Sequence, residues 1–127
     1  MDKTNKIILT ITAVAIIALS AYFFSVNGKP GKYDELAICL KDKGVIFYGA
    51  FWCSHCQANK KLFGSSAKLL PYVECSTPDG QSQTQVCKDK GVNTYPTWEI
   101  ASGTRLLGEQ SLVKLSEASG CPLPSNE

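Results

Sequence analysis

The sequence has almost no excess of charge of either sign and few closely spaced pairs of metal-ligating residues. Its 13 basic and 11 acidic residues give a formal charge of +2. These charges are interspersed along the chain, so the clustered basic face expected of a nucleic-acid-binding protein is missing. A second Cys-x-x-Cys or a Cys-x-x-His pair is also missing, which argues against a four-ligand zinc site. We expect no metal, no cofactor and no nucleic-acid partner.

Cysteine, by contrast, is abundant. Six cysteines in 127 residues are many for a reducing cytosol, where surplus thiols are a liability and disulfides are rare. The composition therefore favours an oxidising compartment. The length suits one domain of about 100 residues after an apolar N-terminal stretch is set aside.

The N-terminus is basic and then apolar. Lys3 and Lys6 precede residues 7–26, which carry no charged side chain and are long enough to cross about 30 Å of hydrocarbon as a helix. A cleavage site before Ala21 would make this a removable signal peptide. Apolar residues continue past that site, so we interpret residues 1–26 as a retained single-pass signal-anchor. The cysteine content then places the C-terminal part outside the cytoplasm.

Glycine, proline and apolar spacing divide the remaining chain into a linker at residues 27–32, a domain at 33–121 and a tail at 122–127. The first helix has one apolar face, made by Tyr33, Leu36, Ala37 and Leu40. The other expected elements are strands at 45–48 and 69–75, helices beginning at Cys53 and spanning 82–90 and 111–119, and a hairpin of strands 97–100 and 104–107. This order indicates an α/β domain.

Cys53 and Cys56 form a dithiol at the expected junction of an apolar strand and a helix. The helix N-terminus favours thiolate at Cys53, because its backbone N–H groups and dipole stabilise negative charge. His55, between the two sulfurs, can add positive charge or a hydrogen bond. Cys53 is expected to be the exposed sulfur, which forms the mixed disulfide with the substrate, and Cys56 the resolving one. Lys60 and Lys61 are interpreted as a solvated face of the same helix.

The motif Trp52-Cys53-x-x-Cys56, with Tyr95-Pro96-Thr97 before the hairpin, resembles the thioredoxin fold, a central mixed sheet flanked by helices. The resemblance implies a cis Pro96 facing the dithiol and a Tyr95 that offers backbone groups to the substrate chain. Without the dithiol, an ordinary trans proline would be the better interpretation of Pro96. Trp52 is expected beside the dithiol, although plain core packing is equally compatible with its position.

Residues 48–56, 72–75 and 91–98 resemble more narrowly the thioredoxin-like domains fused to, or working beside, bacterial and plastid homologues of vitamin K epoxide reductase. The resemblance implies that a membrane enzyme oxidises the dithiol and passes electrons to quinone, while the domain oxidises exported cysteine-containing proteins. This chain has one expected span, so that quinone-linked partner would be a separate protein.

One departure from thioredoxins bears on whether the dithiol site oxidises or reduces its substrates. Phe47 occupies the position of their buried acid, which assists the second cysteine during reduction. Phe47 and His55 together favour an oxidising thiol-disulfide oxidoreductase, because a stabilised thiolate makes the disulfide a stronger oxidant. A reductase or isomerase fed by a membrane electron donor is the alternative, and a redox-inert binding module is a third possibility.

The other cysteines suggest structural bonds. Cys75 ends an expected strand and Cys87 lies in the next expected helix, with a turn at Asp79-Gly80 between them, so a disulfide can close there; two buried thiols are the alternative. The narrower family also carries a second pair in this region. Cys39 and Cys121 could pair with each other, or either could be free or intermolecular, since connectivity is not deducible from sequence.

Overall fold

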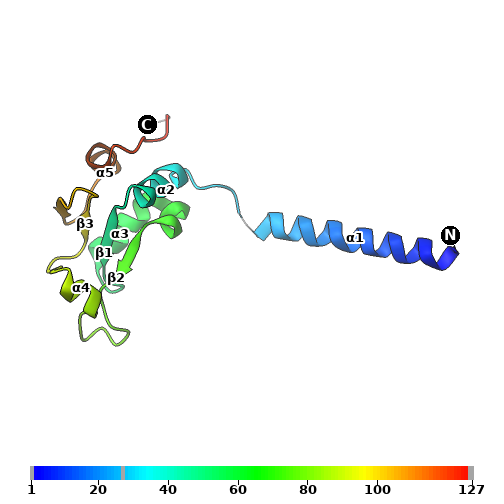
Figure 1. Cartoon of the computed structure of the whole chain (residues 1–127), viewed down its shortest axis with the longest axis horizontal. Helices are drawn as coiled ribbons and strands as arrows, with labels where there is room; N and C mark the ends of the chain where they lie inside the picture. The colour runs from blue at the N-terminus through cyan, green and yellow to red at the C-terminus, as the bar shows by residue number, and fades with distance from the viewer. Residues whose placement is uncertain (1, 27, 126–127) are drawn as a thin grey trace.

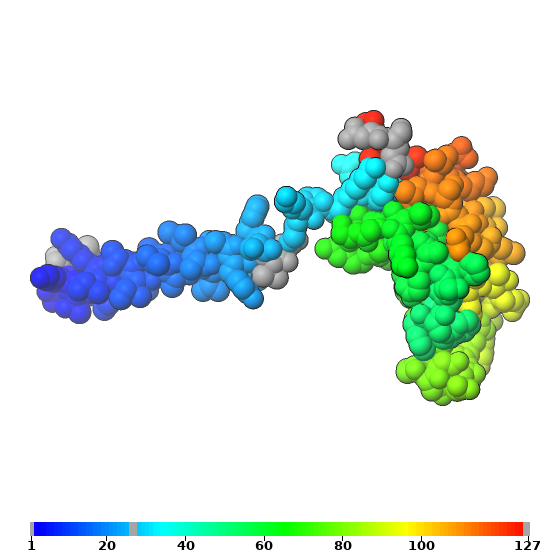
Figure 2. Space-filling view, turned by 180° about the vertical axis from the view of Figure 1, so that it is seen from behind, coloured from blue at the N-terminus to red at the C-terminus, as the bar shows by residue number. Residues whose placement is uncertain are grey.

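The N-terminal helix extends away from the rest of the protein in the computed structural model, which describes residues 2–26 and 28–125 (Figures 1 and 2). Helix α1 (Lys3–Val26) is exposed along its described side chains and is long and apolar enough to cross a membrane. A signal sequence would satisfy the same test of length and composition. Residues 1, 27, 126 and 127, at the ends of the expected anchor, linker and tail, lie outside the described residues.

The remaining elements form a four-stranded mixed sheet with helices on both faces. The sheet order is β2-β1-β3-β4, with β1 parallel to β2 and the other neighbours antiparallel. The α/β class and the mixed sheet predicted from the sequence are therefore confirmed. In chain order the elements are α2 (Asp34–Asp42), β1 (Ile46–Gly49), α3 (Ser54–Phe63), the 3-10 helix η1 (Gly64–Leu69), β2 (Tyr72–Glu74), α4 (Gln85–Asp89), β3 (Thr97–Glu99), β4 (Arg105–Leu107) and α5 (Leu112–Ser119).

Alternation along β1 separates two apolar clusters. Phe47 is fully buried on one side, where it stacks on Trp98 of β3 with ring centroids 4.1 Å apart and meets the edge of Tyr72 of β2 at 5.2 Å. Helices α2, α3 and α5 contribute side chains to this larger cluster. Tyr48 belongs to the second cluster, together with Cys87 of α4. The sheet therefore has α3 and α4 against opposite sides of β1.

Two elements begin later than predicted. The strand expected at 69–75 begins at Tyr72, because the chain leaves α3 through η1 and the Tyr72 N–H donates to the Leu70 carbonyl. The helix expected at 82–90 begins at Gln85. Gln83 instead bridges to Ser76, and its side-chain amide donates to the Val92 carbonyl and the Tyr95 hydroxyl.

Two disulfides hold the edges of the domain. Cys75, just after β2, is bonded to Cys87 of α4, and Cys39 of α2 is bonded to Cys121 after α5. Both bonds join the pairs considered in the sequence analysis. Lys43 adds hydrogen bonds beside the second disulfide, because its ammonium donates to the carbonyls of Ser119 at 3.0 Å and Gly120 at 2.9 Å. The first helix and the C-terminal tail are thus joined both covalently and by hydrogen bonds.

Removing the Cys39–Cys121 bond should destabilise the protein more than removing Cys75–Cys87. The sequence separations are 82 and 12 residues, and the chain-entropy relation gives losses of about 4.5 and about 3 kcal/mol. Denaturant unfolding of the two double-alanine variants of the full chain in detergent measures both losses. The opposite order of stability would contradict the entropic account of these bonds.

Candidate active site

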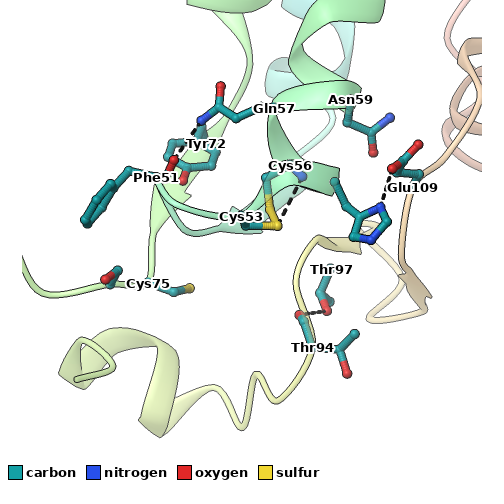
Figure 3. Close-up of a disulfide and its surroundings, with 12 residues drawn as sticks. Phe51, Cys53, Cys56, Gln57, Asn59, Tyr72, Cys75, Thr94, Thr97 and Glu109 are labelled. Carbon is teal, nitrogen blue, oxygen red and sulfur yellow. Dashed lines mark hydrogen bonds and ion pairs between the residues drawn. A yellow bond between two sulfur atoms is a disulfide. The ribbon is translucent and has the colours of Figure 1, made fainter. Parts of the chain in front are cut away.

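Cys53 is the N-cap of α3. Its sulfur accepts a hydrogen bond from the Cys56 backbone N–H at 3.1 Å, and the two residues are joined by a disulfide (Figure 3). The turn after β1 is closed by a hydrogen bond of 3.0 Å from the Cys53 N–H to the Ala50 carbonyl. The predicted strand-to-helix junction is therefore confirmed. At this position the free N–H groups of the helix stabilise a thiolate when the bond is reduced.

The two sulfurs differ in their access to the surface. Cys53 is 6% exposed and Cys56 is fully buried, so Cys53 is less open than expected but remains the outer member of the pair. Cys53 lines a surface hollow of about 470 Å³ with Trp52, Ser54, His55 and Tyr95. The hollow thus gives access to Cys53, whereas Cys56 does not line it.

Trp52 and Tyr95 form one wall of this hollow. Trp52 is 56% exposed; its ring meets Tyr95 edge to face at 5.9 Å, and its Nε1 donates to the Ser76 hydroxyl at 2.9 Å. Plain core packing of Trp52 is therefore wrong. The Tyr95–Pro96 peptide bond is cis, which is the conformation that the thioredoxin resemblance implied. The structure thus brings Trp52 and Tyr95 together beside Cys53.

His55 has a partner that the sequence did not suggest. Its Nδ1 contacts Glu109 Oε1 (Figure 3). Glu109 lies between β4 and α5, where the backbone of Gln110 is fixed by the buried Asn59 of α3. The Asn59 amide donates to the Gln110 carbonyl at 2.7 Å and accepts from the Gln110 N–H at 3.1 Å. The carboxylate is therefore held beside the imidazole by a segment anchored to the active-site helix.

A second polar group lies on the Cys56 side of the dithiol. The Tyr72 hydroxyl donates to Glu74 Oε2 at 2.9 Å, and the Lys60 ammonium lies 3.4 Å from the centre of the Tyr72 ring. Lys60 is half-buried, so its assignment to a solvated face was wrong, whereas Lys61 is exposed as expected. Burial lowers the pKa of Lys60, and the nearby Glu74 opposes that shift. Sequence periodicity could not reveal these contacts, because they join α3 to β2.

The described residues, 2–26 and 28–125, contain no group of three or more His, Cys, Asp or Glu side chains arranged to hold a metal ion.

Comparison with known proteins gives two informative relatives. A thiol-disulfide oxidoreductase from Arabidopsis thaliana is 43% identical over 93 residues, which are 69% of this chain and 24% of that protein. A protein disulfide-isomerase from Humicola insolens is 28% identical over 105 residues, which are 81% of this chain and 20% of that protein. The matched regions thus span about a quarter or less of these relatives. No family model matches the chain.

The domain is thioredoxin-like. This assignment follows from the mixed sheet, the disulfide at the start of α3, and the two relatives named for thiol-disulfide chemistry. Within this thioredoxin-like domain, Glu109 and the Tyr72–Glu74 pair are the polar neighbours of the dithiol that pattern reasoning missed.

Glu109→Gln should increase the thiolate fraction of reduced Cys53 at neutral pH by roughly three- to tenfold. The carboxylate opposes a nearby thiolate and offsets the positive charge that His55 can bring to it. The rate of alkylation by iodoacetamide measures the thiolate fraction. Glu117→Gln, on the exposed side of α5, is the matched control.

A double-mutant cycle tests whether Glu109 acts on the Cys53 thiolate directly or through the His55 imidazole. In a His55→Ala background, Glu109→Gln should have a smaller effect if the carboxylate acts through the imidazole. An undiminished effect would show that Glu109 acts directly on the thiolate. No change in the His55-containing protein would contradict the electrostatic role of Glu109.

Proposed function

We propose that the protein is a membrane-anchored, extracytoplasmic thiol-disulfide oxidoreductase that oxidises cysteines of exported proteins. The observation that supports this proposal most is the Cys53–Cys56 disulfide at the N-terminus of α3, with Cys53 lining a surface hollow and Cys56 fully buried. The two relatives add support, because both are named for thiol-disulfide chemistry.

The oxidising cycle follows from this difference in access. A substrate thiolate attacks Cys53 Sγ, which forms a mixed disulfide and releases Cys56 as a thiolate. A second substrate thiolate then attacks the substrate sulfur of the mixed disulfide and releases Cys53. The substrate loses two electrons and gains a disulfide, while the domain becomes a dithiol. Trp52 and Tyr95 border the position of the attacking chain.

Three features support the oxidising direction. The α3 N-terminus stabilises the Cys53 thiolate, and His55 can add a positive charge beside it that the Glu109 carboxylate offsets in part. Stabilising the thiolate stabilises the dithiol form, which makes the disulfide the stronger oxidant. Phe47, in place of the acid that serves thioredoxins in reduction, is an aromatic core residue stacked on Trp98.

Turnover then requires an oxidant that regenerates the disulfide. We propose a separate membrane protein similar to vitamin K epoxide reductase, which takes the two electrons from the dithiol and passes them to quinone. The sequence resemblance of residues 48–56, 72–75 and 91–98 supports this partner. Helix α1 would hold the domain beside it at the membrane surface.

Cys56→Ala should accumulate mixed disulfides through Cys53, because the resolving thiol is absent. Exported cysteine-containing proteins should appear as trapped substrates, and a multi-span membrane protein with redox cysteines should appear as the electron acceptor. Non-reducing electrophoresis with mass spectrometry identifies them. Cys53→Ala is the matched control and should trap neither; retained turnover in Cys53→Ala would contradict the dithiol assignment.

Equilibration of the full chain with glutathione buffers measures the reduction potential of the Cys53–Cys56 pair, which tests whether the domain oxidises or reduces its substrates. An oxidant should have a potential clearly above the thioredoxin value of about −270 mV, toward the value of about −120 mV found for a strong periplasmic oxidant. In cells the pair should be mostly oxidised and become reduced when quinone reduction is blocked. A mostly reduced pair with a thioredoxin-like potential would favour the reductase alternative.

A reporter fused after Glu127 should be active only outside the cytoplasm, and the protein should stay in the membrane fraction after a high-salt wash. The physical reason is the uncharged stretch at residues 7–26, which is long enough to span the hydrocarbon layer. A soluble mature form that begins near Ala21 would show instead that the segment is a cleaved signal peptide.

A further inference from the structure

We propose that Tyr72 and Glu74 form the path by which the buried Cys56 thiol exchanges its proton with water during disulfide exchange. This inference rests on the proposed function and assigns roles to two residues near the same site. Cys56 is fully buried, yet it must lose a proton before it can attack Cys53 and regain one after it is released. Phe47, two residues before Gly49 on β1, is an aromatic core residue that packs on Trp98 and Tyr72, so the polar groups of β2 are the candidates for this exchange.

Gly49 brings the Tyr72 hydroxyl and the Cys56 sulfur to the same small space. A Cβ added at Gly49 would lie 3.0 Å from Cys56 Sγ, 2.8 Å from Tyr72 Cε2 and 3.3 Å from the Tyr72 hydroxyl oxygen. The sulfur and the hydroxyl therefore both border the space that this glycine leaves open. The close approach of β1 to both groups depends on the absent side chain.

Glu74 is held in the orientation that such a path requires. Its Oε1 accepts from the Ser76 N–H at 2.9 Å and from the Phe51 N–H at 3.2 Å, which leaves Oε2 to accept from the Tyr72 hydroxyl at 2.9 Å. Glu74 is half-buried rather than enclosed. Its carboxylate can therefore exchange a proton with water while it remains fixed next to Tyr72.

The charged and titratable groups that face Tyr72, beside Cys56, come from three segments of the chain. Lys60, four residues later on α3, lies over the Tyr72 ring, and β2 supplies Tyr72 and Glu74. Tyr95, from the loop before β3, also acts electrostatically on Tyr72. Burial and the hydrogen bond to Glu74 raise the pKa of Tyr72, so its hydroxyl stays protonated. Tyr72 therefore accepts one proton as it donates another and does not itself become charged.

The proton moves in a balanced sequence when Cys53 carries a mixed disulfide. The Cys56 thiol passes its proton to the Tyr72 oxygen as the Tyr72 hydroxyl passes its own to Glu74 Oε2, and Glu74 then releases that proton to water. The Cys56 thiolate attacks Cys53 Sγ, which forms the Cys53–Cys56 bond and expels the partner as a thiolate. When Cys56 is the leaving group, the same path runs in reverse and delivers a proton to it.

The test uses the reduced full chain in detergent and an aryl disulfide, dithionitrobenzoate, which releases a coloured thiolate. Attack by Cys53 releases the first equivalent, and attack by Cys56 on the mixed disulfide releases the second. Tyr72→Phe should leave the first phase unchanged and slow the second at least about tenfold at neutral pH. The difference should disappear at high pH, where hydroxide ionises Cys56 directly. Glu74→Gln should slow the second phase with the same pH dependence.

Tyr48→Phe is the matched control, because Tyr48 lies on the adjacent strand but in the other apolar cluster, and it should change neither phase. A second phase that is unchanged in Tyr72→Phe or Glu74→Gln, or slowed equally at every pH, would overturn the proton path. A wild-type protein without a second phase would contradict the proposed function as well. A normal wild-type second phase combined with unaffected variants would contradict the proton path alone.

Discussion

The hydrogen bond from the Cys56 N–H to Cys53 Sγ is the interaction on which the site depends. A residue at an N-cap meets the backbone N–H three positions later, and the same spacing allows the two sulfurs to bond. Helix α3 therefore begins at Ser54 with both the N-cap hydrogen bond and the disulfide formed across its first turn. The position of the Cys53 sulfur also depends on the turn from Ala50 to Cys53, which connects the end of β1 to the start of α3.

The core behind α3 positions the loop that carries Glu109 on the His55 side of the dithiol. Trp98 stacks on Phe47 and donates from its indole N–H to Asn59 Oδ1 at 3.1 Å. Asn59 in turn holds the backbone of Gln110, which fixes Glu109 beside His55. One buried amide thus connects the central strand, the active-site helix and the loop that carries a charge to the site. Its hydrogen bonds matter because an unpaired buried amide is costly.

Local chemistry was sufficient to predict much of this arrangement. The dithiol at a helix start, the apolar face of α2, the hairpin of β3 and β4, and the end of α5 at Gly120 each depend on residues close in sequence. The starts of β2 and α4 were placed too early, because η1 and the Ser76–Gln83 bridge respond to tertiary contacts.

Contacts between distant segments were the part that pattern reasoning could not supply. The pairing of His55 with Glu109 and the position of Lys60 over Tyr72 depend on how elements pack, and neither leaves a periodic signal. The mixed order of the sheet also depends on how distant segments pack. It was implied by the resemblance to the thioredoxin fold and not by the residues of any one strand. Charged residues on a helix that also carries the active site are therefore better treated as candidates for tertiary contacts than as solvent-facing by default.

The disulfide between Cys39 and Cys121 also gives the domain an unusual connectivity. It closes residues 39–121 into one covalent ring that holds the sheet and the dithiol, with α1 and the linker attached as a single arm. A protease that cuts an exposed loop of this ring once leaves both fragments joined to each other and to the arm. Release of either fragment requires a second cut or reduction of the bond. In the extracytoplasmic setting proposed above, the ring would keep a nicked domain attached to α1.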